Sequence, residues 1–259
     1  MSLLSAGLTD IGMKRKSNQD AIYLNQEKKI FVVADGMGGH NGGDIASAMA
    51  VKYIPEYMLE HFDEDPLATI IGSIKHANNV IKEKGKNDPD LTGMGTTAVT
   101  FLFKGDSVYI GNVGDSRAYL VSRKKLYQMS IDHSLVQEKL NLSILGNTGN
   151  YSREIAAGDP QKNIIVRTVG FEDVVDVDVF NYQVNKNDIL FMCSDGLHGK
   201  VSDRDILHII NSCIPDPTTA SRDDLQNTVK KLIGQANANG GQDNISVVLI
   251  LAQWTWKYI

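Results

Sequence analysis

The sequence shows neither a membrane-spanning run nor the pattern of a cleavable leader, so we expect neither. No stretch approaches the ~20 consecutive apolar residues that a transmembrane helix needs. The N-terminus reaches Asp10 without the charged segment and apolar run of a secretory signal peptide. We therefore expect a cytoplasmic protein that has no membrane partner.

Cysteine and clustered charge are also scarce. The two cysteines, Cys193 and Cys213, fall in separate predicted elements, so we expect reduced thiols and no disulfide. The formal net charge is −5 and no long run has one sign, whereas a nucleic-acid surface needs clustered Lys and Arg. The six histidines show no zinc-site spacing. Nucleic acid and structural zinc are therefore not expected.

What is present is the composition of an ordinary globular domain. The 259 residues are 42% hydrophobic and 22% charged, and no Pro-, Gly- or Ser-rich linker divides them. We expect one domain over residues 1–259. Apolar alternation predicts strands at 21–25, 30–34, 96–103, 107–112, 118–122, 125–128, 164–168, 174–180, 189–193 and 245–253. Helical spacing predicts helices at 43–61, 66–84, 203–213 and 218–236.

Grouped strands between paired helices indicate an α+β fold. We expect a four-layer αββα sandwich, in which helices flank two antiparallel β-sheets packed face to face. Residues 141–163 contain several Gly and Asn and have weak periodicity, so they should form a long surface segment of the kind that is functional or mobile.

Four aspartates lie next to the ends of apolar strands: Asp20, Asp35, Asp195 and Asp243. If the central strands are adjacent, these ends can meet at one edge of the sandwich. Like charges ~4 Å apart repel by about 4 kcal/mol at an effective dielectric constant near 20, so such a cluster needs a cation. One Asp-Gly pair alone is more simply a turn, but four aspartates in the same context favour a shared metal site.

The donor types indicate which metal. Gly36 and Gly196 follow two of these aspartates, and glycine lets a backbone carbonyl approach a ligand closely. Carboxylate, carbonyl and water oxygens select hard cations such as Mg²⁺ or Mn²⁺.

Seven ordered sequence blocks resemble the metal-dependent type 2C serine/threonine phosphatases, particularly the compact bacterial members. The blocks are TDIGMKRKSNQDA at 9–21, VVADGMGGH at 32–40, GTTAV at 95–99, GNVGDSRAYL at 111–120, DHSLVQ at 132–137, CSDGL at 193–197 and GGQDNISVV at 240–248. The resemblance therefore covers nearly the whole chain. It implies hydrolysis of phosphoserine and phosphothreonine in proteins by a water or hydroxide between two divalent cations, without a side-chain nucleophile.

The resemblance also implies roles for the acidic residues. Asp35 would bridge the two ions, Asp195 and Asp243 would complete the first site, and the Gly36 carbonyl would bind the second. Asp20 would support the second ion through water. These roles make Asp35, Asp195 and Asp243 the catalytic set, acting through metal-activated water.

Two further residues complete the implied site. Asp132 would hold a third, weaker cation together with Asp195. Arg15 would grip the substrate phosphate with its guanidinium fork. Taken without the resemblance, Arg15 is more simply a solvated member of the Lys14-Arg15-Lys16 triplet. Asp115 in the GDSR block is expected to tie turn backbone, a structural role.

Two positions depart from the family pattern. Met37 stands where the eukaryotic branch has a histidine thought to protonate the leaving group, and nearby His40 is more simply a solvent-facing or capping residue. Gln19 stands where many members have glutamate, which makes the second metal site less negative. The segment 141–163 corresponds to the family's flap, either a determinant of substrate choice or an inert loop.

Two other functions remain open. A catalytically dead module of the same fold could bind a partner, although none of the four aspartates is lost. An enzyme with the same metals could instead act on a small phosphorylated metabolite. We expect phosphoprotein substrates, a serine/threonine kinase and its targets as partners, and a monomer.

Overall fold

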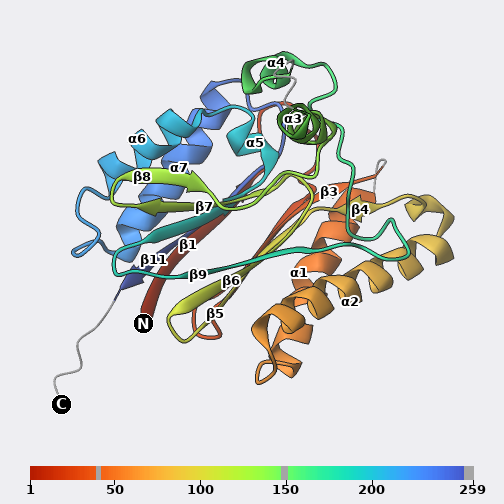
Figure 1. Ribbon diagram of the computed structural model, residues 1–259, viewed down its shortest axis with the longest axis horizontal. Helices are drawn as coiled ribbons and strands as arrows, with labels where there is room; N and C mark the ends of the chain where they lie inside the picture. The colour runs from red at the N-terminus through yellow and green to blue at the C-terminus, as the bar shows by residue number, and fades with distance from the viewer. Residues whose placement is uncertain (39–41, 147–150, 254–259) are drawn as a thin grey trace.

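The computed structural model describes residues 1–38, 42–146 and 151–253, and it contains two antiparallel sheets (Figure 1). One sheet has the order β1-β11-β10-β7-β8, made of β1 (Ser2–Asp10), β11 (Ile245–Gln253), β10 (Ile189–Cys193), β7 (Arg117–Ser122) and β8 (Lys125–Gln128). The other has the order β2-β3-β5-β6-β9, made of β2 (Asp20–Asn25), β3 (Ile30–Met37), β5 (Ala98–Lys104), β6 (Ser107–Val113) and β9 (Asp178–Gln183), and β4 (Gly95–Thr96) also pairs with β3.

Helices cover the outer face of each sheet. The helices α1 (Gly42–Glu60) and α2 (Pro66–Asn87) pack on the β3 sheet, and α6 (Asp203–Cys213) and α7 (Arg222–Ala238) pack on the β11 sheet (Figure 1). A 3₁₀ turn at Pro89–Leu91 follows α2, and further helices of the described residues are α3 (Leu135–Leu145), α4 (Arg153–Gly158) and α5 (Asp195–His198). The four-layer αββα sandwich is therefore confirmed.

The central strands are apolar on both sides because each separates two cores. In β3, Ile30 and Val32 face α1 and α2, whereas Phe31 and Val33 face the other sheet. Successive strand residues point to opposite faces, so a strand buried on both faces needs a continuous apolar run. This packing rigidly positions the strand ends that carry the aspartates.

The predicted strands differ from the structure in three main places, and the helices α3, α4 and α5 were not predicted. The strand β1 was not predicted, although it pairs along its whole length with β11. The strand expected at 164–168 is absent as a regular element, because this segment makes only isolated bridges such as Ser134↔Ile165. The strand expected at 174–180 begins only at Asp178.

The flap segment differs from the irregular loop that its composition suggested. It includes the end of α3 and the short helix α4, which Ser152 caps by accepting a hydrogen bond from the Ile155 N–H. Several apolar side chains of α3 are exposed, including Leu145 at 83%.

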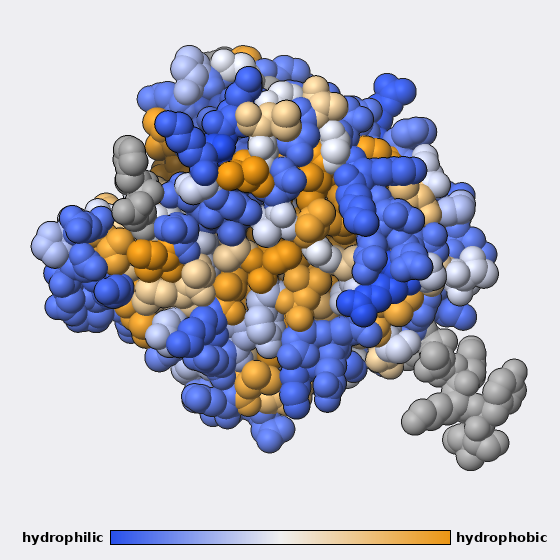
Figure 2. Space-filling view, turned by 180° about the vertical axis from the view of Figure 1, so that it is seen from behind, coloured by the Kyte–Doolittle hydropathy of each residue, from blue (hydrophilic) through white to orange (hydrophobic). Residues whose placement is uncertain are grey.

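On the face seen from behind, a band of apolar side chains crosses the middle of the molecule (Figure 2). Among the described residues, no helix is long and apolar enough to cross a membrane.

Candidate metal centre

Strand pairing brings the first two aspartates together. Asp20, at the start of β2, is the cross-strand partner of Asp35 near the end of β3. Thr97 fixes the Asp35 backbone on the other side: its N–H donates to the Asp35 carbonyl at 2.8 Å, and its hydroxyl accepts from the Asp35 N–H at 2.9 Å. Asp35 is therefore held between two neighbouring segments of one sheet.

The other two aspartates reach the same edge from the second sheet. Asp195 follows the end of β10 and Asp243 precedes the start of β11, and these strands are antiparallel neighbours. Ser194 connects the two sheets, because its hydroxyl donates to Asp20 Oδ2 at 2.7 Å and accepts from the Ser246 N–H at 2.9 Å. The four aspartates thus lie at one edge of the sandwich.

Two glycines make this convergence sterically possible. A Cβ on Gly196 would lie 1.9 Å from the Asn244 carbonyl oxygen, so only glycine lets the residue after Asp195 approach the residue after Asp243. A Cβ on Gly36 would lie 1.9 Å from the Gly43 carbonyl oxygen at the beginning of α1. The Asp-Gly pairs therefore serve close packing as well as the expected turn.

Arg15 lies at this edge and forms an ion pair with Asp243, with Nη2 donating to Oδ2 at 2.6 Å. Asn244, which the sequence did not single out, holds the loop that carries Arg15. Its side-chain amide donates to the carbonyls of Ile11 at 2.9 Å and Ser17 at 3.0 Å, and its Oδ1 accepts from the Gln19 N–H at 2.8 Å. The position of Asn244 directly after Asp243 in the GGQDN block was the sequence feature that could have indicated this role.

The carboxyl groups repel one another strongly. Burial, reinforced by neighbouring carboxylates, raises the pKa of Asp20 and of Asp195 to about 6 and moves the pKa of Asp35 well above its usual range. The charges of Asp20 and Asp195 both contribute to the raised pKa of Asp35. Neutralisation by protons or by cations is therefore required for these groups to stay together.

The donor set fits hard divalent cations. Asp20 and Asp195 each keep one buried carboxyl oxygen that has no hydrogen-bond partner, and all the other converging donors are oxygen atoms as well. In the ranges that the structure describes, no group of three or more acidic, histidine or cysteine side chains is arranged so that it could hold a metal ion directly. Asp243 instead points to Arg15, and Asp20 to Ser194.

Asp132, the residue expected to hold a third cation together with Asp195, is paired with Arg117. Its carboxylate accepts three hydrogen bonds from Arg117, at 2.6, 2.9 and 3.0 Å, and one from Gln128 at 3.1 Å. Asp115 is the residue that lies beside Asp195. Burial and the nearby Asp195 charge raise the pKa of Asp115 to about 8, and its buried Oδ1 has no partner.

Met37 stands at the position where the family pattern has a proton-donating histidine, and the histidines His40 and His198 stand at other positions of the chain. Met37 is 39% exposed at the end of β3, whereas His40 lies outside the described residues. His198, which closes the one-turn helix α5, interacts through Nε2 with the Asp115 carbonyl at 3.0 Å. Burial lowers the pKa of His198 to about 3, so this imidazole is neutral and supports the Asp115 turn.

Comparison with known proteins decides the family. The model of the family described as protein phosphatase 2C matches residues 13–230. The chain belongs to the protein phosphatase 2C family. Among its relatives, the serine/threonine phosphatase stp of Listeria monocytogenes is 37% identical over 256 residues, covering 96% of each chain. Protein phosphatase PhpP of Streptococcus pneumoniae is 34% identical, covering 94% of this chain and 95% of that protein.

Solved structures agree with this phosphatase 2C assignment. The Mycobacterium tuberculosis serine/threonine phosphatase PstP/Ppp superimposes with a TM-score of 0.85 at 30% identity, covering 98% of this chain and 100% of that one. The catalytic domain of PstP in complex with two manganese ions gives a TM-score of 0.81 at 29% identity, covering 97% and 99%.

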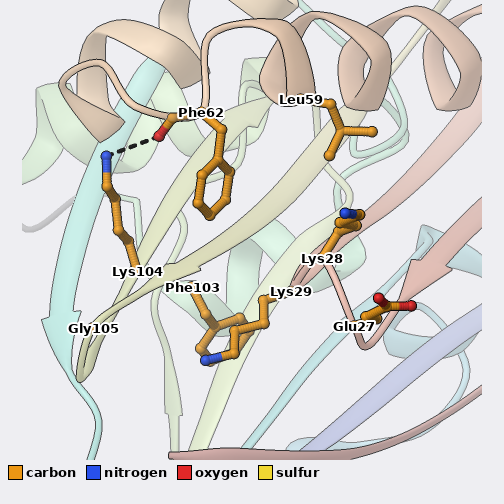
Figure 3. Close-up of a pocket in the computed structure, with 8 residues that line it drawn as sticks. All are labelled: Glu27, Lys28, Lys29, Leu59, Phe62, Phe103, Lys104 and Gly105. Atoms are coloured by element: carbon orange, nitrogen blue, oxygen red, sulfur yellow. Dashed lines mark hydrogen bonds between the residues drawn. The ribbon is translucent and has the colours of Figure 1, made fainter.

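A separate pocket of about 490 Å³ lies at the far end of the phosphatase 2C sandwich (Figure 3). It is lined by the β2–β3 turn, the end of α1 and the end of β5, with Lys28, Phe62 and Lys104 among its residues. The Lys104 ammonium already donates to the carbonyls of Phe62 and Glu64, both at 2.8 Å. The pocket is therefore distinct from the acidic edge.

Proposed function

We propose that this protein is a metal-dependent phosphatase that hydrolyses phosphoserine and phosphothreonine in proteins with two Mn²⁺ or Mg²⁺ ions. The observation that carries the proposal is the convergence of Asp20, Asp35, Asp195 and Asp243 at one edge, next to Arg15. Family membership supplies the reaction class, and this edge supplies the chemistry for it.

The ligand roles follow the positions of the carboxylates. Asp35 is central, because Asp20, Asp195 and Asp243 all raise its pKa, so it is the group that two ions would share. Asp195 and Asp243 would complete the first site. The Gly36 carbonyl and, through water, Asp20 would serve the second. Once bound, the two cations would activate water and stabilise charge at phosphorus.

Arg15 would hold the substrate phosphate. Its guanidinium is about half exposed and pairs with Asp243, whose side chain is 32% exposed. When Asp243 is committed to a cation, that carboxylate attracts Arg15 less, and the fork becomes available for two phosphate oxygens. The residue thereby exchanges one anionic partner for another.

For a third cation, Asp115 is a better candidate than Asp132. Asp115 has a buried, unpartnered oxygen beside Asp195, whereas Arg117 already neutralises Asp132. We therefore transfer the proposed role to Asp115 and Asp195. Asp132 then orients Arg117 behind the site.

The proposal also covers the substrates, the oligomeric state and the location of the protein in the cell. We infer phosphoprotein substrates that a serine/threonine kinase phosphorylates, a monomer and a cytoplasmic location, in a single domain over residues 1–259. The exposed apolar side chains of Leu142, Ile144 and Leu145, at the start of the flap segment 141–163, support a role for the flap in substrate choice.

Hydrolysis of an aryl phosphate with added Mn²⁺, or with a chelator, tests the central claim. Asp35→Asn should lower kcat by about 10²-fold or more, because it removes the shared ligand. Asp223→Asn, an exposed change on α7, is the matched control and should retain full activity. Metal-independent hydrolysis, or unchanged activity in Asp35→Asn, would contradict the mechanism.

A substrate panel separates the remaining alternatives. Phosphoserine and phosphothreonine peptides should give higher kcat/KM than small phosphorylated metabolites of equal charge. The reverse order would identify a metabolite phosphatase. No hydrolysis of any substrate, with Mn²⁺ still bound, would identify a binding module instead.

A further inference from the structure

One buried histidine grips the turn beside the acidic edge at two points. His133 is 6% exposed and lies at the base of the flap. Its backbone N–H donates to the Gly114 carbonyl at 2.9 Å, and its Nδ1 accepts a hydrogen bond from the Gly114 N–H at 3.0 Å. A single residue thus satisfies both backbone polar groups of the glycine that precedes Asp115.

The other ring nitrogen of His133 faces the far side of the flap. A backbone N–H can only donate, so Nδ1 must be unprotonated and Nε2 must carry the ring proton. That Nε2 lies 3.2 Å from Asp178 Oδ2 at the start of β9. Arg167 Nη1, which lies 3.0 Å from the same Nε2, donates to Asp178 Oδ1 at 2.8 Å. The imidazole is therefore fixed from both sides.

The same residue belongs to the base of the flap. The His133 carbonyl accepts from the Val166 N–H at 2.9 Å, and the Leu135 N–H donates to the Ile164 carbonyl at 2.9 Å. The chain consequently enters and leaves the flap as a short antiparallel pair. Arg167 lies just beyond this pair, so its contact with Asp178 anchors the segment that leaves the flap.

The hydrogen bonds between His133 and Gly114 influence two proposed metal ligands, Asp115 and Asp35. Asp115 follows Gly114 directly. In addition, Gly114 has φ +100°, and a Cβ there would lie 2.5 Å from Thr97 Cγ2. Thr97 holds both the N–H and the carbonyl of Asp35. A shift of Gly114 would therefore disturb Asp115 and the support of Asp35 together.

We propose that His133 is a positioning residue with two separable functions. Through Nδ1 it sets the Gly114–Asp115 turn, and hence the affinity of the acidic edge for cations. Through Nε2 it joins that turn to the flap base at Arg167 and Asp178, and hence affects the binding of phosphoprotein substrates. The inference rests on the proposed function.

Two substitutions separate the functions because each amide mimics one ring nitrogen. In His133→Asn the amide oxygen takes the place of Nδ1 and can still accept from Gly114. In His133→Gln the amide reaches toward Asp178 but leaves the buried Gly114 N–H without an acceptor. Mn²⁺ binding by titration calorimetry, kcat for an aryl phosphate, and KM for a phosphothreonine peptide are measured for both.

His133→Gln should weaken Mn²⁺ binding by about tenfold or more, the typical effect of losing an outer partner of a metal site. His133→Asn should keep Mn²⁺ affinity within about twofold of the wild type, and should raise KM for the peptide but not for the aryl phosphate. Equal Mn²⁺ affinity in the two variants, whether unchanged or equally weakened, would overturn the inference.

Controls keep the result interpretable. His208→Gln changes an exposed histidine on α6 and should alter neither quantity. If His133→Gln does not fold, Asp178→Asn carries the test: peptide KM should rise at unchanged Mn²⁺ affinity, and unchanged KM or weakened Mn²⁺ binding would refute the proposal. Wild-type hydrolysis that needs no metal would instead refute the proposed function itself.

Discussion

The buried carboxyl group of Asp115 should make the metal-free protein less stable as the pH rises. Burial and Asp195 raise its pKa to about 8 in the folded state, whereas the ordinary value is 3.8. A group with a raised folded-state pKa contributes stability that is complete below the unfolded pKa and is lost as the pH rises through the folded one. The loss from Asp115 should therefore be clearest between pH 6.5 and 8.

In this pH range the buried histidines do not change the stability of the fold. Burial lowers the pKa of His198 to about 3 and also lowers that of His133, so both destabilise the fold only below the unfolded pKa of 6.5. Between pH 6.5 and 8, one proton held at a pKa near 8 corresponds to roughly 2 kcal/mol of unfolding free energy. For a domain of this size that is a fall in Tm of about 4–8 °C.

Thermal unfolding in chelator at pH 6.5 and 8.0 measures the effect. Asp115→Asn cannot titrate and should flatten the slope, although Asp35, whose pKa is also raised, keeps part of it. Mn²⁺ replaces protons as the neutralising charge, so it should raise Tm more at pH 8.0 than at pH 6.5. An unchanged slope in Asp115→Asn, with Asp223→Asn as control, would refute the reasoning.

Two further substitutions test the geometry of the edge. Arg15→Met should raise KM for an aryl phosphate by about tenfold through the lost phosphate contact, without weakening Mn²⁺ binding, because Asp243 is released; an unchanged KM in steady-state kinetics would exclude Arg15 from phosphate binding. Gly196→Ala should lower the unfolding free energy by about 1–3 kcal/mol or more through overpacking, whereas Gly234→Ala on α7, where a Cβ would meet nothing within 4 Å, should be neutral or stabilising. Equal Tm values for the two alanine variants would contradict the close approach of Gly196.

The layers of the fold could be predicted because their signals are local. The strand β10 and the helix α6 begin and end where apolar alternation and helical spacing place them. By contrast, β1 depends on its partner: it reads SLLSAGLTD, with two serines and a glycine, and it becomes a strand by pairing along its whole length with β11. Pairing with a strand more than 200 residues away leaves no local pattern.

Part of the candidate site could also be predicted from local sequence patterns, and part could not. The sequence indicated which aspartates converge, because their position at strand ends reflects the sheet topology. It did not indicate how Arg15 is held, since the loop is tied down by Asn244, a residue remote in sequence that bonds three of the loop's backbone groups. Hydrogen bonds across such distances become visible only in the folded chain.

Asp115 and Asp132 show why residue type and motif do not determine a role. Both follow strands of the sandwich, and both carry the same carboxyl group. Arg117 lies close enough to give Asp132 a bidentate partner, so that charge is already balanced within the protein. Asp115 has a buried oxygen without a partner and a carboxylate neighbour in Asp195. A cation would stabilise the carboxylate whose charge is not balanced, which is that of Asp115. The surrounding side chains, not the residue type, therefore determine which carboxylate can bind a cation.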